Sequence, residues 1–397
     1  MKIRIAIYFI FTIILFCQSK CRVTKPSTID SNKSFAITSV YIIDGTGLGD
    51  PFRGVVIVES GKIKAVGSEG EINIPSDMLT IDADGAFLLP GFFNTHVHNG
   101  FIQSNLEAWA QAGVTTIRDL GVQYSVFKNQ RPPNDTNIAR LLAAGPVLTT
   151  PGGYPLVPWG SPIGYYVLSP QDGIDKVNKL IDEGADIIKI ILESGTAFNL
   201  TIPMLSPQEA SAIVKTAHQR NRRVSAHVLV SDDLKAALDA GVDDIAHMIT
   251  DDISDDIIER MIRQGVYWVP TLELWNAVES SLVARAKNNL TKYINAGGLV
   301  ALGTDFDGYN SPFDLGMPVT EINLMREAGM TAMQIIVAAT RNAAIVCGVE
   351  QELGTIKAGK IADILVIRGN PLSDLDNLLD VLLVIHNGVI IKDNRYR

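Results

Sequence analysis

The sequence has 397 residues, of which 47% are hydrophobic and 19% are charged, and its formal net charge at pH 7 is −9. This length and composition suit a folded protein with one large domain and one smaller domain, and they exclude a disordered or fibrous chain. The acidic balance disfavours nucleic acid as a partner, because like charges repel.

The first residues have the pattern of an export signal. Lys2 and Arg4 precede an almost continuous apolar stretch over residues 5–16. A short basic segment followed by about 7–15 apolar residues is typical of such signals, whereas a membrane-spanning helix needs about 20 apolar residues. We therefore predict a signal over residues 1–21, a polar tether over residues 22–34, and an exported protein that is periplasmic or on the cell surface.

The three cysteines refine this prediction. Cys17 and Cys21 lie near the end of the signal, and only Cys347 lies in the body of the chain, so we expect no internal disulfide there. The segment that ends at Cys17 loosely resembles a lipoprotein signal, but Phe16 departs from the small residue usual before a lipidated cysteine. Membrane attachment through a lipidated Cys17 and simple cleavage of the signal both remain open.

Residues 35–87 and 351–397 are rich in strand patterns and poor in helix patterns. In the C-terminal segment, Asn387-Gly388 separates two apolar runs, which is a strong signal for a β-hairpin. We expect the two segments to form one small β-sandwich domain together.

Residues 88–350 alternate between short apolar strands and amphipathic helical stretches, which predicts βα units around a parallel sheet. Glycine repeatedly follows a helical stretch and precedes a strand, as it does after helix C-termini. The count of about eight strands predicts an α/β fold with a (β/α)8 TIM barrel, and an open doubly wound sheet is the alternative. The strand candidates are Gly91–His98, Thr115–Leu120, Val147–Thr150, Asp186–Ile191, Val224–Val228, Asp244–His247, Tyr267–Thr271 and Leu299–Asp305.

Four of the six histidines lie at the ends of predicted strands. His96 and His98 are two apart on one strand and therefore point to the same face. The ends of three later strands carry His227, His247 and Asp305. Because the carboxyl ends of barrel strands converge on one mouth, these side chains are candidate ligands of divalent metal, with zinc as the expected ion.

Lys189 lies within an apolar strand, where a charged amine is costly unless it is paired or neutralised. A lysine at the rim of the strand that reaches solvent is one explanation. The functional explanation is a reaction with CO2, which would turn the amine into a carbamate that bridges two metal ions.

Three segments resemble the amidohydrolase superfamily: residues 88–98, which carry His96 and His98, residues 184–190, which carry Lys189, and residues 359–366, which resemble the family's return into the small β domain. Asn94 departs from the aspartate that the family commonly has. The resemblance implies two divalent metal ions bridged by carboxylated Lys189.

By the same resemblance, His96, His98 and Asp305 would hold one ion, and His227 and His247 would hold the other. A hydroxide between the ions would attack the substrate, and Asp305 would be the catalytic residue that transfers the proton.

The branch that the sequence resembles most includes imidazolonepropionase and the Xaa-Pro and Xaa-Arg dipeptidases. We therefore expect hydrolysis of an amide or peptide C–N bond in a small-molecule substrate, such as a dipeptide, an N-acyl amino acid or a cyclic amide. No clear clamp for a substrate carboxylate follows Lys189 or His227, so esterase, lactonase or organophosphate-ester hydrolase activity stays open. A mononuclear deaminase is disfavoured because His227 is followed by Val228-Leu229-Val230, and an inactive binding protein because all six ligands are present.

A few residues around this constellation have weaker assignments. Tyr154 and Trp159 lie in the long segment after the third strand and are candidate substrate-lining residues, although an inert packed loop is equally consistent. Arg118 and Asp119 end the second strand, and we interpret them as a buried ion pair. The sequence leaves a homo-oligomer open.

Overall fold

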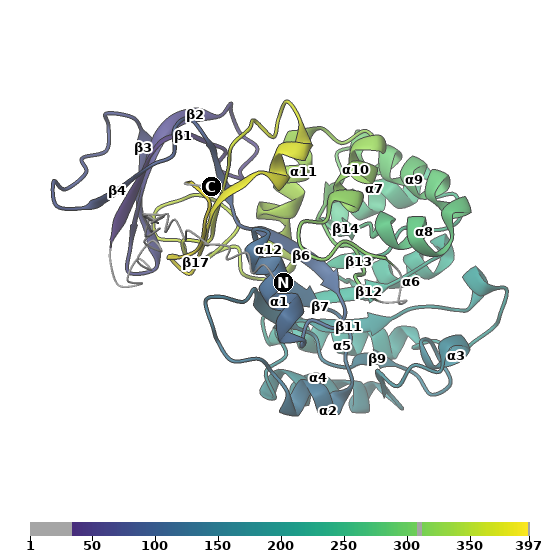
Figure 1. The fold of residues 1–397 in the computed structure, drawn as a ribbon. Helices are drawn as coiled ribbons and strands as arrows, with labels where there is room; N and C mark the ends of the chain where they lie inside the picture. Colours follow the sequence, from purple (N-terminus) through teal and green to yellow (C-terminus); the bar gives the residue numbers. More distant parts are fainter. Residues whose placement is uncertain (1–33, 308–311, 396–397) are drawn as a thin grey trace, which may run out of the picture.

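The computed structural model of the protein describes residues 34–307 and 312–395. The predicted signal over residues 1–21, Cys17 and all but the last residue of the predicted tether lie outside this part of the chain. Within it, none of the helices combines the length and apolar character that crossing a membrane requires. The fold is mixed α/β, with two parallel sheets beside a third sheet of mixed strand direction (Figure 1).

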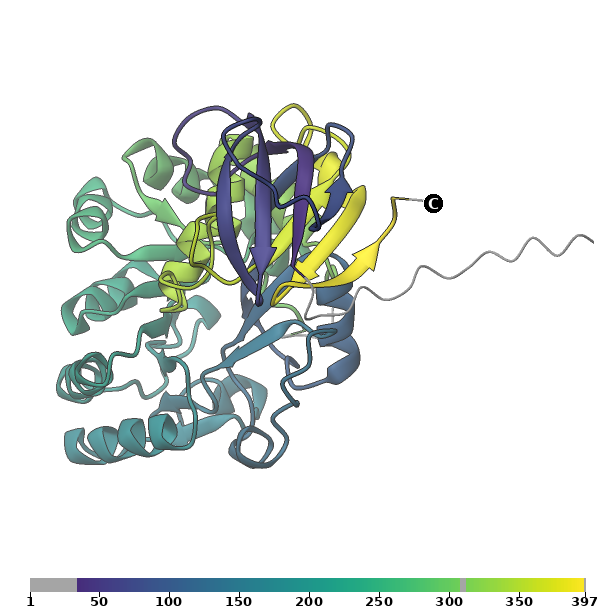
Figure 2. The same cartoon turned by 90° about the vertical axis from the view of Figure 1, so that its left-hand side faces the viewer.

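The mixed sheet joins segments from both ends of the described chain. Its strand order is β18-β17-β16-β5-β1-β2-β3, and β4 also pairs with β1. In Figure 2 the purple strands of residues 35–68 lie beside the yellow strands of the C-terminal part. Its strands are β1 (Phe35–Ile42), β2 (Phe52–Glu59), β3 (Lys62–Ser68), β4 (Leu79–Asp82), β5 (Phe87–Pro90), β16 (Ile364–Ile367), β17 (Val381–His386) and β18 (Val389–Asp393).

The hydrogen bonds of β1 connect all of these strands into one sheet. One edge of β1 pairs with β2, and the other pairs with β4 along its first half and with β5 along its second half. Strands from both ends bury one apolar cluster, which includes Phe35, Leu88 and Leu383. The Asn387-Gly388 hairpin is confirmed: β17 and β18 pair antiparallel, and both turn residues have positive φ.

Two parallel sheets hold the middle of the chain. One has the order β10-β9-β11-β12-β13-β14-β15 and the other the order β6-β7-β8. Their strands are β6 (Phe92–Val97), β7 (Val114–Asp119), β8 (Arg140–Ala143), β9 (Val147–Thr149), β10 (Gly164–Tyr166), β11 (Ile188–Ile191), β12 (Val224–His227), β13 (Asp244–Ala246), β14 (Tyr267–Val269) and β15 (Leu299–Val300).

Backbone hydrogen bonds connect the two parallel sheets on both sides. The Asp186 N–H donates to the Ala143 carbonyl, 2.9 Å away, which joins β8 to the start of the β11 segment. On the other side, the Thr95 N–H of β6 donates to the Leu302 carbonyl beyond β15, also at 2.9 Å. Gly303 permits this approach, because a Cβ there would lie 2.9 Å from the backbone nitrogen of His96. Strand β6 therefore runs beside the segment that leads to Asp305.

Helices follow most of the parallel strands, and their ends agree with the sequence signals. Ser206 and Glu209 form a capping box at the start of α5, and Gly241 ends α6 in a left-handed conformation. The helices are α1 (Gln103–Gln111), α2 (Tyr124–Asn129), α3 (Leu156–Trp159), α4 (Pro170–Asp182), α5 (Pro207–Gln219), α6 (Ser231–Ala240), α7 (Asp255–Gln264), α8 (Leu272–Val278), α9 (Val283–Asn295), α10 (Val319–Glu327), α11 (Ala332–Ala339) and α12 (Arg341–Val346), with 3-10 turns η1 (Thr196–Phe198), η2 (Ser280–Leu282) and η3 (Leu375–Leu379).

Three strands differ from the prediction. β8 and β10 were not among the expected strands; both are short, β8 begins with a polar residue and β10 with a glycine, so their patterns do not stand out. The last predicted strand, Leu299–Asp305, forms ladder pairs only at Leu299 and Val300. The Ala301 N–H still donates to the Trp268 carbonyl of β14, and from Leu302 the chain lies beside β6.

Candidate metal centre

The six side chains predicted as metal ligands all line one cavity of about 580 Å3, a size typical of small-molecule sites. His96 belongs to β6, and His98 follows its last residue. Lys189 belongs to β11, and His227 is the last residue of β12. The remaining two are His247, directly after β13, and Asp305, in the segment beyond β15. The structure therefore brings residues up to 209 positions apart to one cavity, from parallel strands and from the segments that follow them.

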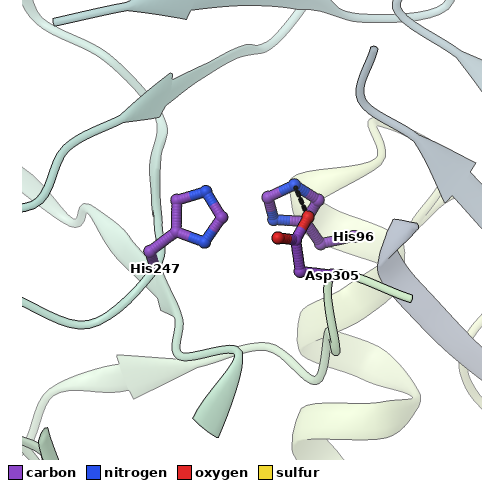
Figure 3. A group of neighbouring side chains, drawn as sticks. All are labelled: His96, His247 and Asp305. Carbon is purple, nitrogen blue, oxygen red and sulfur yellow. Dashed lines mark ion pairs between the residues drawn. The ribbon is translucent and has the colours of Figure 1, made fainter. Parts of the chain in front are cut away.

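His96, His247 and Asp305 form the tightest group of potential ligands in the described chain. One ligand atom from each lies within 4.8 Å of the others, and all three residues are buried. Figure 3 shows the two imidazole rings and the carboxylate around a common space, with an ion pair between His96 and Asp305. The Asp305 Oδ1 atom is 3.1 Å from the Nε2 atoms of both His96 and His98. The rings of His227 and His247 have centroids 4.7 Å apart, so His227 borders the same group.

Backbone strain coincides with this group. His247 has φ of 74° and Asp305 has φ of 62°, in the left-handed region that side chains rarely adopt. Such a conformation costs on the order of 1–3 kcal/mol and persists where surrounding contacts impose it, often at functional sites. Two strained residues that aim their side chains into one cavity indicate a site built for binding.

Hydrogen bonds orient two of the histidines. The Nδ1 atom of His98 is 2.9 Å from the Gly121 carbonyl, which requires a proton on that nitrogen. The Nδ1 atom of His247 is 3.0 Å from the Thr271 Oγ1 atom. An oxygen partner at one ring nitrogen fixes the ring and leaves the other nitrogen available to a metal ion.

Burial and charge set the protonation of the group. Burial lowers the pKa of His96 to about 3, against the attraction of Asp305, and holds the pKa of His247 well below its ordinary value. Burial opposes the charged form of His98 as well, but Asp305 and Asp119 outweigh it and raise its pKa to about 9. For Asp305, burial favours the neutral acid, yet the neighbouring histidines hold its pKa well below the usual range.

The donor set fits divalent metal ions. Neutral imidazoles and an ionised carboxylate are the ligands that zinc and related ions prefer. Among the described residues, His96 Nδ1, His227 Nε2 and Lys189 Nζ are buried polar atoms with no hydrogen-bond partner. Unpaired buried nitrogens are uncommon, and a bound ion would explain them. We find the residues present to be compatible with a metal centre.

Lys189 is the most unusual member of the site. Its side chain is 3% exposed. Burial lowers the pKa of its amine to about 7 from an ordinary value of 10.5; nearby Asp244 opposes this shift and Arg118 adds to it. The location at the solvent-exposed rim that we considered is therefore wrong, because the strand places the amine inside the cavity.

The structure corrects the predicted ion pair between Arg118 and Asp119. Arg118 does not pair with Asp119: it forms a buried ion pair with Asp244, at 2.8 Å, because adjacent strand residues point to opposite faces. Asp119 accepts hydrogen bonds from the Gly100 and Gly121 N–H groups.

Glu193 was not among the predicted site residues. It is fully buried two residues beyond the end of β11, and its Oε2 atom is 3.7 Å from the His227 Nε2 atom. An acidic residue straight after an apolar strand that carries a candidate ligand was the available signal.

Tyr154 and Trp159, the predicted substrate-lining residues, both line the cavity. Tyr154 stacks on His227, with ring centroids 4.3 Å apart. Sequence reasoning did not find Phe198 or Trp275, which lie near them. These two belong to segments that follow other strands, and nothing in the local sequence connects them to Tyr154.

Comparisons with known proteins agree with this architecture. A family model described as the amidohydrolase family matches residues 87–391, which include all six candidate ligands. Ochratoxinase from Aspergillus niger is 28% identical over 434 residues, covering 91% of this chain and 87% of that protein. Imidazolonepropionase from Symbiobacterium thermophilum is 23% identical over 363 residues, covering 79% of this chain and 83% of that protein. The crystal structure of a Xaa-Pro dipeptidase with bound methionine in the active site is 25% identical, with a TM-score of 0.75, and covers 90% of this chain and 99% of that one.

Proposed function

The chain belongs to the amidohydrolase family and is a hydrolase, and from this membership we propose that it cleaves an amide-type C–N bond in a small molecule. The names of its relatives, a Xaa-Pro dipeptidase among them, favour an amide or peptide bond over an ester. The main support for the proposal is that six potential metal ligands line one cavity. One of them is Lys189, which is buried and whose Nζ atom has no hydrogen-bond partner among the described residues.

The proposal includes a closed (β/α)8 barrel as the scaffold. The hydrogen bonds from β8 to the β11 segment, and from β6 to the segment beyond β15, support closure on both sides. In a closed barrel the strand ends share one mouth, which accounts for the convergence of the six side chains. Residues 88–350 would form the barrel, and residues 35–87 and 351–397 the smaller β domain.

We assign the ligands to two ions, with zinc as the expected metal. His96, His98 and Asp305 would hold one ion, and His227 and His247 the other. Lys189 would bridge them as a carbamate, formed when its neutral amine reacts with CO2. Its burial and its unpaired Nζ atom support this, because both favour the neutral amine over the ammonium ion. When bound, divalent ions lower the pKa of a water molecule and polarise the scissile carbonyl group.

Asp305 is assigned the proton transfer. Its carboxyl is ionised at neutral pH, since the neighbouring histidines keep its pKa low. It can therefore accept a proton from the attacking water and deliver it to the departing nitrogen. Its Oδ1 atom faces both His96 and His98, which hold it at the cavity wall.

Metal analysis and a substrate screen test the proposal together. The purified full chain, loaded with Zn2+ and dialysed, should retain about two ions, and chelation should abolish activity that Zn2+ restores. The screen compares dipeptides, N-acyl amino acids, cyclic amides, lactones, aryl esters and organophosphate esters. Cleavage restricted to the esters and lactones would contradict the assignment to C–N bonds. About one ion per chain would favour a mononuclear deaminase, and no ion a binding protein.

A further inference from the structure

A second, apolar pocket adjoins the metal centre. It shares Tyr154, Trp159, His227 and His247 with the larger cavity, so the two spaces adjoin. Three elements complete its wall: η1 contributes Phe198, the segment after β12 contributes Leu229, and α8 contributes Leu274, Trp275 and Val278. All of these elements lie beyond the carboxyl ends of parallel strands.

The aromatic rings of this pocket form a connected set. Tyr154 lies nearly parallel to Phe198, with an interplanar angle of 3° and ring centroids 5.8 Å apart. Trp159 meets Phe198 edge-on, at 87° and 5.9 Å. Tyr154 also stacks on His227, a candidate metal ligand. The set therefore extends from the candidate ligand His227 to the half-exposed Trp159, in the parallel and edge-on geometries by which rings attract one another.

The chemistry of the wall selects an apolar ligand. Apart from the two histidines, the lining residues among those that the structure describes are aromatic or aliphatic, and none is acidic or basic. Trp159 is 53% exposed, while Leu229 and Leu274 are buried. When a ligand covers a large aromatic side chain that is half exposed to water, the burial of that apolar surface stabilises the complex.

We propose that this aromatic pocket, defined by Tyr154, Trp159, Phe198 and Trp275, binds a planar aromatic group of the substrate whose amide bond is cleaved at the adjoining metal centre. The assignment rests on the proposed function for the cleavage, but the recognition of the ring rests on the pocket itself. With this pocket, we expect the preferred substrate to be an amide that carries an aryl side group a few bonds from the scissile bond. An aliphatic group of similar size would fill the same space without the stacking contacts.

The test uses two uncharged amides that differ in one side chain, N-acetylphenylalaninamide and N-acetylleucinamide. With the zinc-loaded full chain, kcat/KM should be about 10-fold higher for the phenylalanine compound, a ratio equivalent to about 1.4 kcal/mol. Trp159→Ala and Phe198→Leu should reduce this ratio to about 2 or less. Trp159 is half exposed, so its truncation leaves the core packing intact. Leu168→Ala is the matched control, because Leu168 is exposed and lines neither pocket, and it should keep the ratio of the unaltered chain.

A second measurement separates this inference from the proposed function. Binding of 2-naphthylmethanol, an aromatic probe without an amide bond, is followed by equilibrium dialysis against the zinc-loaded chain. We expect binding that weakens about 5-fold or more in Trp159→Ala and is unchanged in Leu168→Ala. Binding of this kind without hydrolysis of any amide would support the aromatic pocket and overturn the proposed function. Hydrolysis of both amides at similar rates, unaffected by Trp159→Ala, would overturn the aromatic pocket and leave the proposed function standing.

Discussion

Replacing Lys189 by methionine should change stability and activity in opposite directions. The Lys189 side chain is 3% exposed, and its Nζ atom has no hydrogen-bond partner in residues 34–307 and 312–395. Burial lowers the pKa of the amine from 10.5 to about 7. Since each tenfold loss of proton affinity corresponds to about 1.4 kcal/mol, holding the ammonium form inside the folded protein costs on the order of 5 kcal/mol.

The sign of the stability effect follows from proton linkage. Between about pH 7 and pH 10.5 the unfolded chain keeps the proton on Lys189, while the folded, metal-free chain loses it. The free energy of unfolding therefore rises with pH across this window and is lowest below it. Methionine has a similar length and no charge, so the metal-free variant should be more stable than the parent chain at pH 7, by about 1–4 kcal/mol. Urea denaturation in the presence of EDTA measures this difference.

Activity should fall in the same variant. Without Lys189 the bridge between the two proposed ions is lost, and the retained metal should drop from about two ions per chain to one or none. The loss of metal-assisted catalysis is worth several kcal/mol, so kcat/KM should fall by at least about 1,000-fold. Acetate should partly restore activity to Lys189→Ala, because it can supply the missing carboxylate. Lys235→Met is the control, since Lys235 is exposed and should change neither property.

Two results would refute this reasoning. Full activity with two retained ions in Lys189→Met would show that Lys189 is not a metal ligand. A lower stability of the metal-free variant would show that the amine has a stabilising partner in the folded chain, in contradiction to its burial without one.

Three further predictions concern other groups. Asp305→Asn should lower kcat/KM by about 100- to 10,000-fold, because an amide accepts no proton; normal turnover by a variant with full metal content would contradict this. Burial raises the pKa of Glu321 to about 8 from 4.5, so the folded chain retains a proton that the unfolded chain loses, and stability falls as pH rises through that window. Glu321→Gln should therefore be more stable than the parent chain by about 1–3 kcal/mol at pH 8 and by less at pH 4; an equal difference at both values would contradict it. If Cys17 is lipidated, Cys17→Ser should move the protein from the membrane fraction to the soluble fraction of the producing cells; an unchanged distribution would favour simple cleavage.

Several features of the site were readable from short stretches of sequence. His96 and His98 are two apart, and strand alternation places them on one face whatever surrounds the strand. Lys189 stood out because its neighbours are all apolar. The capping box at Ser206 and the hairpin at Asn387 follow the same logic, since each depends on contacts within a few residues.

Other features depended on how distant segments meet. The Arg118–Asp244 pair joins residues 126 positions apart, and the sequence offered Asp119 as the nearer but geometrically excluded partner. Glu193 reaches His227 from the segment after a neighbouring strand. The short strand β8 and the early end of β15 are set by pairing with neighbouring strands, which local propensity does not reveal.

By itself, then, the sequence determined which residues are candidate ligands, because alternation, caps and apolar runs act over a few positions along the chain. Only the tertiary structure decided what surrounds those ligands: the aromatic pocket beside His227, the true partner of Arg118 and the burial of Lys189. These depend on how the loops beyond separate strands pack against one another. That packing is a property of the twist and pairing of the whole set of strands, and no single segment encodes it.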